Sequence, residues 1–366
     1  MVVPSYFSNL AQSQNMQFLL DTAQANLNKQ SIWRNYLVQG TPQMSLNFDS
    51  AIGRDRVAAA ASVVDSDAPA PLRSRNKLEL YKGKIPAIKE KFRMQQDDMR
   101  SLEVLKSLNI GNVGDDLTRF LDKDLQEAAV SGDKRIDLML SQAMSTLTID
   151  INTTNNPDGV AYGVIDLLAQ SYQKQGVPTV WTDSVNATPI DDIQNFLELQ
   201  WNSRGRSFGV IKMSYTLWLT FRKAKQVKDY LATYFNLQKT SASFAVTREN
   251  INEYFAANDM PPIEIMNEIT HIEVDGQPTF VKGFNANNVS FMPSGIIGTL
   301  FNAISMERIH PVQNKTYAMY GATLVSKWSE SDPLVEFTGM EMNAFPSINV
   351  DNVFVLTTNT VQASFV

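Results

Sequence analysis

The chain has 366 residues, 43% of them hydrophobic and 19% charged, which is ordinary for a folded protein of two or three domains. Its net charge of −6 argues against a protein that reads nucleic acid through a basic face, and the lack of cysteine excludes disulfides and thiolate sites and fits a reducing cytoplasm. No run of 18 apolar residues and no secretory signal pattern occurs, so we expect neither a membrane span nor export.

Residues 1–49 form an N-terminal arm. Asn9–Leu37 has helical character, but it is rich in Gln and Asn, and its apolar stripe is narrow: Leu10, Phe18, Leu19, Ala23 and Leu27. This pattern favours a segment that lies on a partner. A helix packed on its own domain is an equally open alternative.

Residues 50–93 are the least globular part of the chain. Pro69 and Pro71 exclude a continuous helix, and the apolar residues from Leu78 to Ile88 alternate enough to predict two short strands around Gly83. Residues 73–93 carry a net charge of +6, which leaves −12 for the rest. The eight basic residues are Arg73, Arg75, Lys77, Lys82, Lys84, Lys89, Lys91 and Arg93. A basic hairpin on an acidic chain suggests docking on an acidic neighbour, with a solvated hairpin or a phosphate site as alternatives.

A charged helix at Asp97–Leu108 precedes a long helix, predicted over residues 114–147. Apolar or small residues recur there every three or four positions: Leu117, Leu121, Leu125, Ala128, Gly132, Ile136, Met139, Ala143 and Leu147. The helix also carries a set of acidic residues, which we expect on a solvated or partner-facing surface: Asp115, Asp116, Asp122, Asp124, Glu127, Asp133 and Asp137. Such a helix is roughly 50 Å long, so it must extend beyond one compact domain.

A strand from Thr148 is expected to pair with residues 160–168, and a second domain begins near Gly176. Thr188 and Pro189 start a helix there as cap and first residue. The further elements expected are a strand at Val210–Ser214, helices at Tyr215–Leu231 and Glu249–Ala257, a hairpin at 269–284 that turns at Asp275-Gly276, and strands at 289–293, 334–337 and 353–357.

Catalytic and metal-binding patterns are nearly absent from the sequence. The two histidines, His271 and His310, are not at metal-ligand spacing, and no phosphate-binding or nucleophile motif occurs. Three carboxylates could in principle bind Mg²⁺: Asp183, Asp191 and Asp192. We expect no catalytic residue, no cofactor and no metal. The basic residues between Arg222 and Lys228 are interpreted as a solvated helix face.

The order of these parts resembles an HK97-type major capsid protein, and the local sequence is similar to the lambda-like E family of tailed double-stranded DNA bacteriophages. The similar stretches are residues 82–91 (KGKIPAIKEK), 135–143 (RIDLMLSQA), 181–183 (WTD), 189–192 (PIDD), 291–299 (FMPSGIIGT) and 345–356 (FPSINVDNVFVL). The resemblance covers roughly residues 50–360. Residues 1–48 and 232–268 match less well.

The resemblance implies an α+β fold with an N-terminal arm, an extended loop at 50–93, a peripheral domain at 94–177 built on the long helix, an axial domain at 178–320, and C-terminal strands at 321–366 that return to the peripheral domain. It implies assembly with copies of itself into pentamers and hexamers of an icosahedral head in the virion, put together in the host cytoplasm. The implied partners are portal, scaffold and decoration proteins, with packaged DNA held only non-specifically and no membrane.

The basic loop of one subunit would then rest on the acidic long helix of the next. Two other functions remain open at this stage. One is an encapsulin-type shell, which has the same fold but encloses enzyme cargo. The other is a soluble α+β enzyme that would use Asp183, Asp191 and Asp192 with Mg²⁺.

Overall fold

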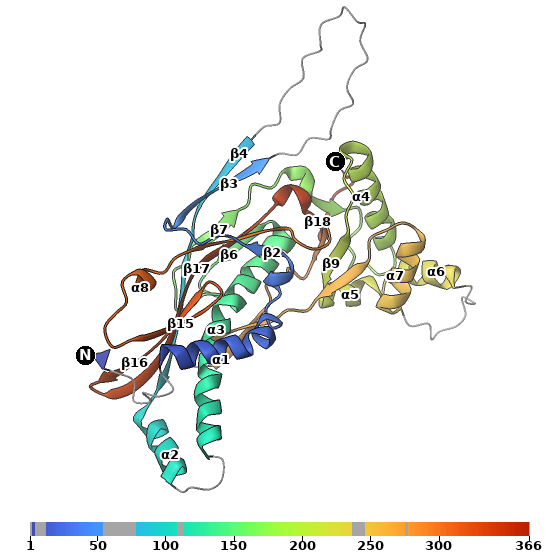
Figure 1. Cartoon of the computed structure of the whole chain (residues 1–366). Coiled ribbons are helices and arrows are strands. Elements are labelled where there is room, and N and C mark those ends of the chain that lie inside the picture. Colours follow the sequence, from blue (N-terminus) through green and yellow to red (C-terminus); the bar gives the residue numbers. More distant parts are fainter. Residues whose placement is uncertain are drawn as a thin grey trace, which may run out of the picture. The chain divides into compact units, whose positions relative to one another are not determined.

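A computed structural model of the chain describes residues 2–3, 12–53, 78–107, 113–235, 246–274 and 277–365 (Figure 1). The chain forms two units. Unit 1 comprises Met1–Phe48, Lys82–Leu138 and Gly298–Ser347, and unit 2 comprises Asp49–Tyr81, Met139–Ile297 and Ile348–Val366. The boundary between Leu138 and Met139 falls inside the long helix, so one helix contributes to both units. No helix in the described ranges is long and apolar enough to cross a membrane.

Unit 1 is built around a sheet, and its elements follow the chain in three passes. They are β1 (Val2–Val3), α1 (Ser13–Asn28), a 3-10 turn (Trp33–Asn35), β2 (Leu37–Gln39), β5 (Ala87–Met94), α2 (Gln96–Ser107), most of α3 (Val113–Thr146), β14 (Gly298–Ala303), α8 (Met306–Ile309), β15 (Thr316–Tyr320), β16 (Thr323–Ser331) and β17 (Leu334–Ile348).

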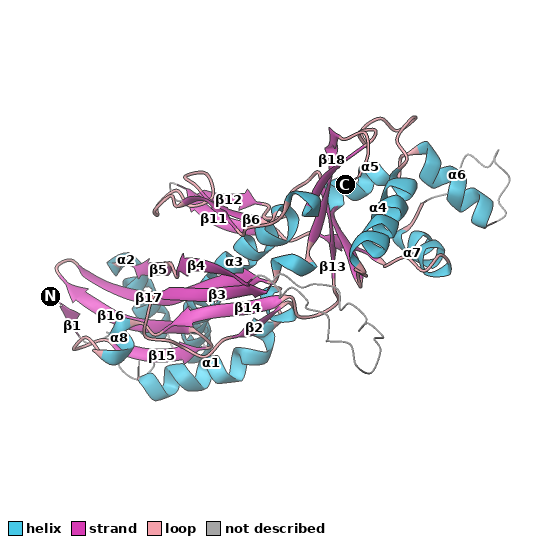
Figure 2. Ribbon diagram, turned by 90° about the horizontal axis from the view of Figure 1, so that it is seen from above, coloured by secondary structure: helices cyan, strands magenta, loops and turns pink. Residues whose placement is uncertain are grey.

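The described strands of unit 1 form a seven-stranded sheet with the order β1-β16-β17-β14-β2, in which β15 also pairs with β16 and β5 with β17. The long strand β17 is the centre of this sheet. It runs antiparallel to β16 from Met342↔Thr323 to Leu334↔Ser331, and antiparallel to β5 from Glu336↔Met94 to Asn343↔Ala87. Figure 2 shows these strands side by side.

The helix α1 packs on its own unit rather than extending from it. Met16, Leu20 and Leu27 are buried, and the side-chain amide of Gln17 exchanges two hydrogen bonds with the backbone of Met319 in β15 (2.8 and 3.0 Å). The predicted helix over Asn9–Leu37 is therefore too long, because α1 ends at Asn28. The predicted stripe was also partly wrong, since Phe18 is 69% exposed.

The long helix α3 is confirmed, with bounds one residue from the prediction. All described members of the predicted apolar stripe are buried, from Leu125 to Leu147. Within unit 1 the stripe packs on β17, since a Cβ added at Gly132 would lie 2.6 Å from Cε of Met340. The helical period therefore located the buried face of this helix correctly.

Unit 2 contains a larger number of short elements. They are β3 (Asn47–Gly53), β4 (Leu78–Lys84), the end of α3, β6 (Thr148–Ile151), β7 (Gly163–Asp166), a 3-10 turn (Ser171–Gln173), β8 (Lys174–Val177), α4 (Pro189–Arg204), β9 (Val210–Ser214), α5 (Tyr215–Phe221), α6 (Lys225–Tyr234), α7 (Arg248–Ala257), β10 (Ile263–Met266), β11 (Thr270–Val274), β12 (Gln277–Val281), β13 (Asn288–Met292), a 3-10 turn (Val350–Asn352) and β18 (Phe354–Val361).

The core of unit 2 lies around a five-stranded sheet with the order β10-β9-β13-β18-β8. The residues of β9 and β13 are buried throughout, as expected for strands covered on both faces. Phe196 of α4 packs against Phe291 of β13 with the rings tilted and their centroids 4.7 Å apart. The end of α3 is fixed to β13, because Ser290 Oγ donates to the carbonyl of Met144 (2.7 Å) and so satisfies a helix-terminal acceptor.

Several predicted elements of unit 2 are confirmed. Strand β6 pairs antiparallel with β7, and β11 pairs with β12, although the turn expected at Asp275-Gly276 lies outside the described residues. Helix α4 begins with Pro189, as predicted. The Thr188 side chain makes no capping hydrogen bond to the helix backbone, so that part of the prediction is wrong.

The predicted helix Tyr215–Leu231 is two helices, α5 and α6, with a break at residues 222–224. The reason is tertiary: Ala224 is buried in an extended conformation, and the amide of Lys225 donates to the carbonyl of Ser184 (2.7 Å) instead of continuing the helix. The helical pattern of the sequence predicts neither the burial of Ala224 nor this hydrogen bond.

The two strands predicted around Gly83 exist, but they do not form a hairpin with each other. Strand β4 runs through Gly83 and pairs with β3, whereas β5 begins at Ala87 and pairs with β17. The strands separate at Ile85-Pro86, where the Ile85 amide donates to the carbonyl of Leu46 (2.7 Å) and Pro86 has no amide to donate.

The C-terminal strands were expected to return together to the peripheral domain, but they divide between two sheets. Strands β16 and β17 lie in the seven-stranded sheet of unit 1, whereas β18 lies between β13 and β8 in unit 2. A strand pattern predicts that a segment is buried and extended, and it does not predict which strand will be its neighbour.

Candidate functional site

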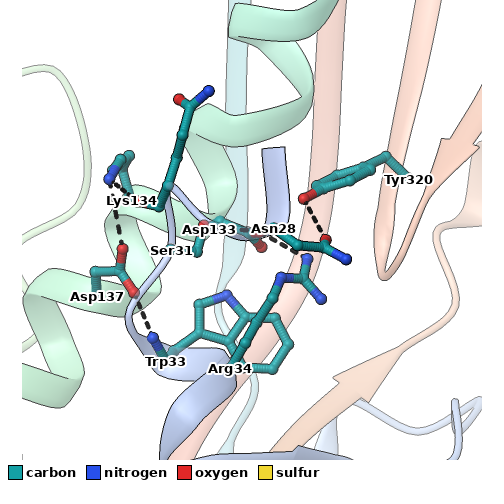
Figure 3. A network of polar contacts seen from close by, with 9 residues as sticks. Asn28, Ser31, Trp33, Arg34, Asp133, Lys134, Asp137 and Tyr320 are labelled. Atoms are coloured by element: carbon teal, nitrogen blue, oxygen red, sulfur yellow. Dashed lines mark hydrogen bonds and ion pairs between the residues drawn. The ribbon is translucent and has the colours of Figure 1, made fainter. Parts of the chain in front are cut away.

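A buried polar cluster joins the N-terminal arm to α3 in unit 1 (Figure 3). We call it the arm cluster, and it consists of Asn28, Ser31, Trp33, Arg34, Asp133, Lys134, Asp137 and Tyr320. The arm residues come from the turn between α1 and β2, the carboxylates come from one face of α3, and the tyrosine comes from β15. Asp133 and Asp137 are four residues apart, so both point to the same side of the helix.

Asp133 is the centre of the cluster. Its Oδ2 accepts hydrogen bonds from Ser31 Oγ (3.1 Å) and from Arg34 Nη2 (2.7 Å), and the second contact is also an ion pair. The Arg34 guanidinium lies over the ring of Trp33 (4.4 Å to the centroid) and near that of Tyr320 (5.3 Å). Burial, followed by the charge of Asp133, raises the pKa of Tyr320 to about 12. The charge of Asp133 is thus neutralised by an arginine that is itself held by two aromatic rings.

Asp137 has a different environment. Its Oδ1 accepts from the backbone amide of Trp33 (2.8 Å), and its Oδ2 has no hydrogen-bond partner among the described residues, with Lys134 Nζ 3.8 Å away. The same lysine donates to the carbonyl of Gln30. Burial raises the pKa of Asp137 to about 7. The arm is therefore held by one well-neutralised carboxylate and one poorly neutralised carboxylate.

This arrangement corrects the expectation that the acidic residues of α3 lie on a solvated or partner-facing surface. Asp133 and Asp137 are 1% and 2% exposed and bind the chain's own arm. Asp124 is partly buried, and that burial raises its pKa, while the positive charge of Lys327 of β16 acts to lower it. Glu127 is exposed and pairs with Lys123 (3.7 Å).

Three further candidates on α3, Asp115, Asp116 and Asp122, have side chains outside the described residues. Among the acidic residues of α3 whose side chains are described, only Glu127 is exposed to solvent. The other three are partly or fully buried because the apolar stripe of the helix is wider than the sequence indicated, so that residues at its margins are buried with it.

The candidate basic residues are only partly described. Arg73, Arg75, Lys77 and the side chain of Lys82 lie outside the described residues, whereas Lys84, Lys89, Lys91 and Arg93 are exposed. Lys89 Nζ lies 3.3 Å from a carboxylate oxygen of Glu341, and Lys91 Nζ lies 5.0 Å from the ring centre of Phe337, both on the neighbouring strand β17. Strand β5 therefore presents a basic, solvent-accessible face.

The carboxylates considered for Mg²⁺ do not form a metal site. Asp192 is buried and accepts from Nε1 of Trp181 (2.8 Å), Asp191 accepts from the Tyr230 hydroxyl (2.9 Å), and Asp183 accepts from Asn186 Nδ2 (2.8 Å). Within the described ranges no group of three His, Cys, Asp or Glu residues could hold a metal ion. These residues hold the start of α4 and the turn before it.

Sequence reasoning missed the arm cluster, although one signal was present. At about 100° per residue, Asp133 and Asp137 directly follow the stripe members Gly132 and Ile136, so they lie at the edge of the buried face and not opposite to it. Their burial requires a donor from elsewhere in the chain. The arginine that supplies it is about a hundred positions away.

No protein-family model and no curated protein matches the sequence. Among solved structures, a protein provisionally assigned as the capsid protein of an E. coli CFT073 prophage aligns with a TM-score of 0.56 and 14% identity, over 98% of this chain and 99% of that one. A phage-related protein of Bordetella bronchiseptica RB50 aligns over 98% of both chains (TM-score 0.43, 9% identity), and the capsid subunit of cyanophage A-1(L) over 93% of both (0.44, 12%). The chain therefore has the α+β fold of HK97-like capsid structures over nearly its whole length.

Proposed function

We propose that this chain is the major capsid protein of a tailed double-stranded DNA phage. It is a structural subunit with no catalytic role, and it assembles with copies of itself into pentamers and hexamers of an icosahedral head. The observation that carries the proposal is the fold, shared along 98% of this chain and 99% of a chain assigned as a prophage capsid protein.

The proposal extends to the roles of the domains. Residues 1–49 are the arm, 50–93 the extended loop, 94–177 the peripheral domain, and 178–320 the axial domain that meets its copies around five-fold and six-fold axes. The strands of 321–366 contribute to both sheets, as described above. The motifs at 82–91 and 345–356 favour the lambda-like E family within this fold.

The partners are, first of all, other copies of the chain, and then portal, scaffold and decoration proteins of the same head. Packaged DNA is held without sequence specificity. A net charge of −6 suits a wall that must not bind the DNA inside it tightly, because tight binding would need many phosphate contacts from Lys and Arg. The location is the virion, after assembly in the host cytoplasm.

Negative-stain electron microscopy of the purified full chain, combined with size-exclusion chromatography, tests the proposal. We expect closed particles of uniform diameter, or discrete rings, that elute at or near the void volume. A chain that elutes only as a monomer or small oligomer under all conditions of salt and concentration contradicts the proposal and favours the enzyme alternative.

Nuclease treatment of particles from producing cells separates the phage head from an encapsulin-type compartment. A head protects double-stranded DNA from the enzyme, whereas a compartment contains protein cargo and no protected DNA. Particles that repeatedly contain one co-purifying enzyme and no nucleic acid would contradict the phage assignment and leave the shell assignment intact.

A further inference from the structure

The β6–β7 sheet carries exposed apolar and acidic side chains. Residues 148–173 contain three aspartates, Asp150, Asp158 and Asp166, and no Lys or Arg, and the next residue, Lys174, is near enough for the charge of Asp166 to raise its pKa against the effect of burial. Within ten residues the same stretch exposes Val160 (66%), Tyr162 (53%) and Val164 (65%). A two-stranded sheet is marginally stable by itself, and exposed apolar side chains next to each other usually mark a binding surface.

The side chains of this surface share one face of the sheet. Val164 and Asp166 are two positions apart in β7, so they project from the same side, Asp150 lies opposite Val164 on β6, and the exposed Tyr162 directly precedes the strand. We call this set the acidic face. It combines apolar side chains with carboxylates, so it fits a partner that presents lysine or arginine side chains. The aliphatic part of such a side chain can cover the apolar groups while its charged end reaches a carboxylate.

Strand β5 offers the complementary set. Lys89, Lys91 and Arg93 are also two positions apart, all three are exposed, and Glu90 is the only acidic residue of the strand. In the described sheets β5 pairs only with β17 and β7 pairs only with β6, so both are edge strands. The chain therefore carries two different exposed surfaces of opposite charge.

We propose that, in the assembled shell, β5 of a second copy of this chain lies across the acidic face. This inference rests on the proposed function, and it names the surface that receives the basic segment. It moves that surface from α3, where the described carboxylates are mostly buried, to β6–β7. Two unlike patches on one chain are what a head-to-tail contact in a ring of copies requires. Pairing of the acidic face with itself is disfavoured by like charge.

Charge reversal with rescue tests the pairing. The double variants Asp150→Lys/Asp166→Lys and Lys91→Glu/Arg93→Glu are each expected to lower the yield of particles by about tenfold or more, because each places like charges at the contact. The combined four-residue variant restores complementarity between copies and is expected to recover most of the yield. Glu249→Lys/Glu253→Lys on α7 makes the same charge change on exposed residues outside the acidic face, and is expected to lower the yield less and not to be rescued by the β5 variant.

Site-specific cross-linking provides a second measurement, which can be made even if the substitutions lower the yield of particles. Because the chain has no cysteine, an Asp166→Cys chain and an Arg93→Cys chain can be mixed, assembled and treated with a short thiol cross-linker. We expect a covalent dimer that is at least about tenfold more abundant than in a mixture of Glu253→Cys and Arg93→Cys chains.

The outcomes separate the two proposals. If wild-type chain forms no particle or ring, the proposed function fails. If the wild type assembles and both reversal variants assemble equally well, or the cross-link does not exceed the control, the acidic face is not the receiving surface. If each reversal blocks assembly but the combined variant is not rescued, β5 does not lie on the acidic face. If reversing Asp115 and Asp116 rescues the β5 variant instead, the partner of β5 is α3.

Discussion

Asp137 is the residue at which burial and charge conflict most clearly. Its carboxylate is 2% exposed, one oxygen has no hydrogen-bond partner among the described residues, and the nearest cation, Lys134, is 3.8 Å away and shared with Gln30. Removing a charge from water without full compensation is unfavourable. The same residue nevertheless accepts a hydrogen bond from the Trp33 amide. That hydrogen bond holds the arm, whereas the buried charge of Asp137 weakens the attachment of the arm.

The attachment of the arm should therefore depend on pH. The pKa of Asp137 is about 7 in the folded chain, against about 3.8 ordinarily. Between these two pH values Asp137 is protonated when the arm is docked on it and ionised when the arm is released. Raising the pH therefore lowers the free energy of opening, by at most roughly 1.4 kcal/mol per pH unit, and this loss levels off above pH 7. Hydrogen exchange of residues 12–39, measured from pH 4 to 8 and corrected for intrinsic rates, reports this.

Asp137→Asn is the control for that measurement, because Asn keeps an oxygen for the Trp33 amide but cannot ionise. We expect the Asn variant to lose the pH dependence and to hold the arm at pH 8 at least as well as the wild type does. A variant that releases the arm at every pH would mean that the charge of Asp137 stabilises docking, in contradiction to this account.

Arg34 should matter more than an exposed ion pair does. Arg34→Ala leaves the Asp133 carboxylate, 2% exposed at the side chain, with Ser31 as its hydrogen-bond donor. We expect docking of the arm to weaken by ~3 kcal/mol, at the lower end of the range for a broken buried pair, since the arginine side chain is 22% exposed. Arg34→Lys keeps the charge but loses the planar stack on Trp33, so exchange protection of the arm should be intermediate.

At the scale of elements, close backbone contacts determine which positions must be glycine. A Cβ at Gly132 of α3 would meet Cε of Met340 at 2.6 Å and Sδ of Met342 at 2.9 Å, which are the ends of flexible side chains. A Cβ at Gly176 of β8 would meet the backbone oxygen of Thr360 at 2.4 Å, where β18 departs from regular pairing. A methionine can change its rotamer, whereas a paired backbone cannot move without breaking the sheet.

The two glycines should respond differently to alanine. Gly132→Ala is expected to change the stability of unit 1 by less than about 1 kcal/mol, because the better helix propensity of alanine offsets the shift of two methionines. Gly176→Ala should destabilise unit 2 by about 1–3 kcal/mol through overpacking. Hydrogen exchange of β8 and β18, compared with that of β17, measures each effect in its own unit. Equal effects of the two substitutions would contradict this reasoning.

At the scale of the whole molecule, charge is distributed unevenly along the chain. Residues 73–93 carry +6 and the remaining residues −12, whereas exposed single ion pairs contribute only about 0–1 kcal/mol each. Such weak contacts matter when they are repeated over every subunit of a closed shell. If the proposed function is right, the basic segment contributes more to assembly than to the stability of the single chain.

Reversing Arg73, Arg75 and Lys77 to Glu should block assembly and leave the single chain folded. The matched control is reversal of Arg222, Lys223 and Lys228, which are exposed around the break between α5 and α6 and make the same charge change. Sedimentation velocity measures the assembled fraction, and circular dichroism measures the folded fraction. Equal assembly of the two triple variants would show that total charge matters and that the position of the basic residues does not.

The sequence by itself determined the local elements of this protein. The three-to-four-residue period placed α3 to within one residue, and Pro189 placed the start of α4, because helical period and proline geometry depend on neighbours in the chain. The break between α5 and α6 could not be predicted in this way, since it depends on a hydrogen bond from Lys225 to Ser184 some forty positions away.

Only the tertiary structure decided which segments meet. It placed β4 with β3, β5 with β17 and β18 in the sheet of unit 2, and it turned Asp133 and Asp137 from expected surface residues into anchors of the arm. A residue pattern indicates which face of a segment is buried and which is exposed to water. Strand pairing and charge neutralisation, by contrast, depend on groups far away in the chain. For that reason the elements were predictable here, while their neighbours and the arm cluster were not.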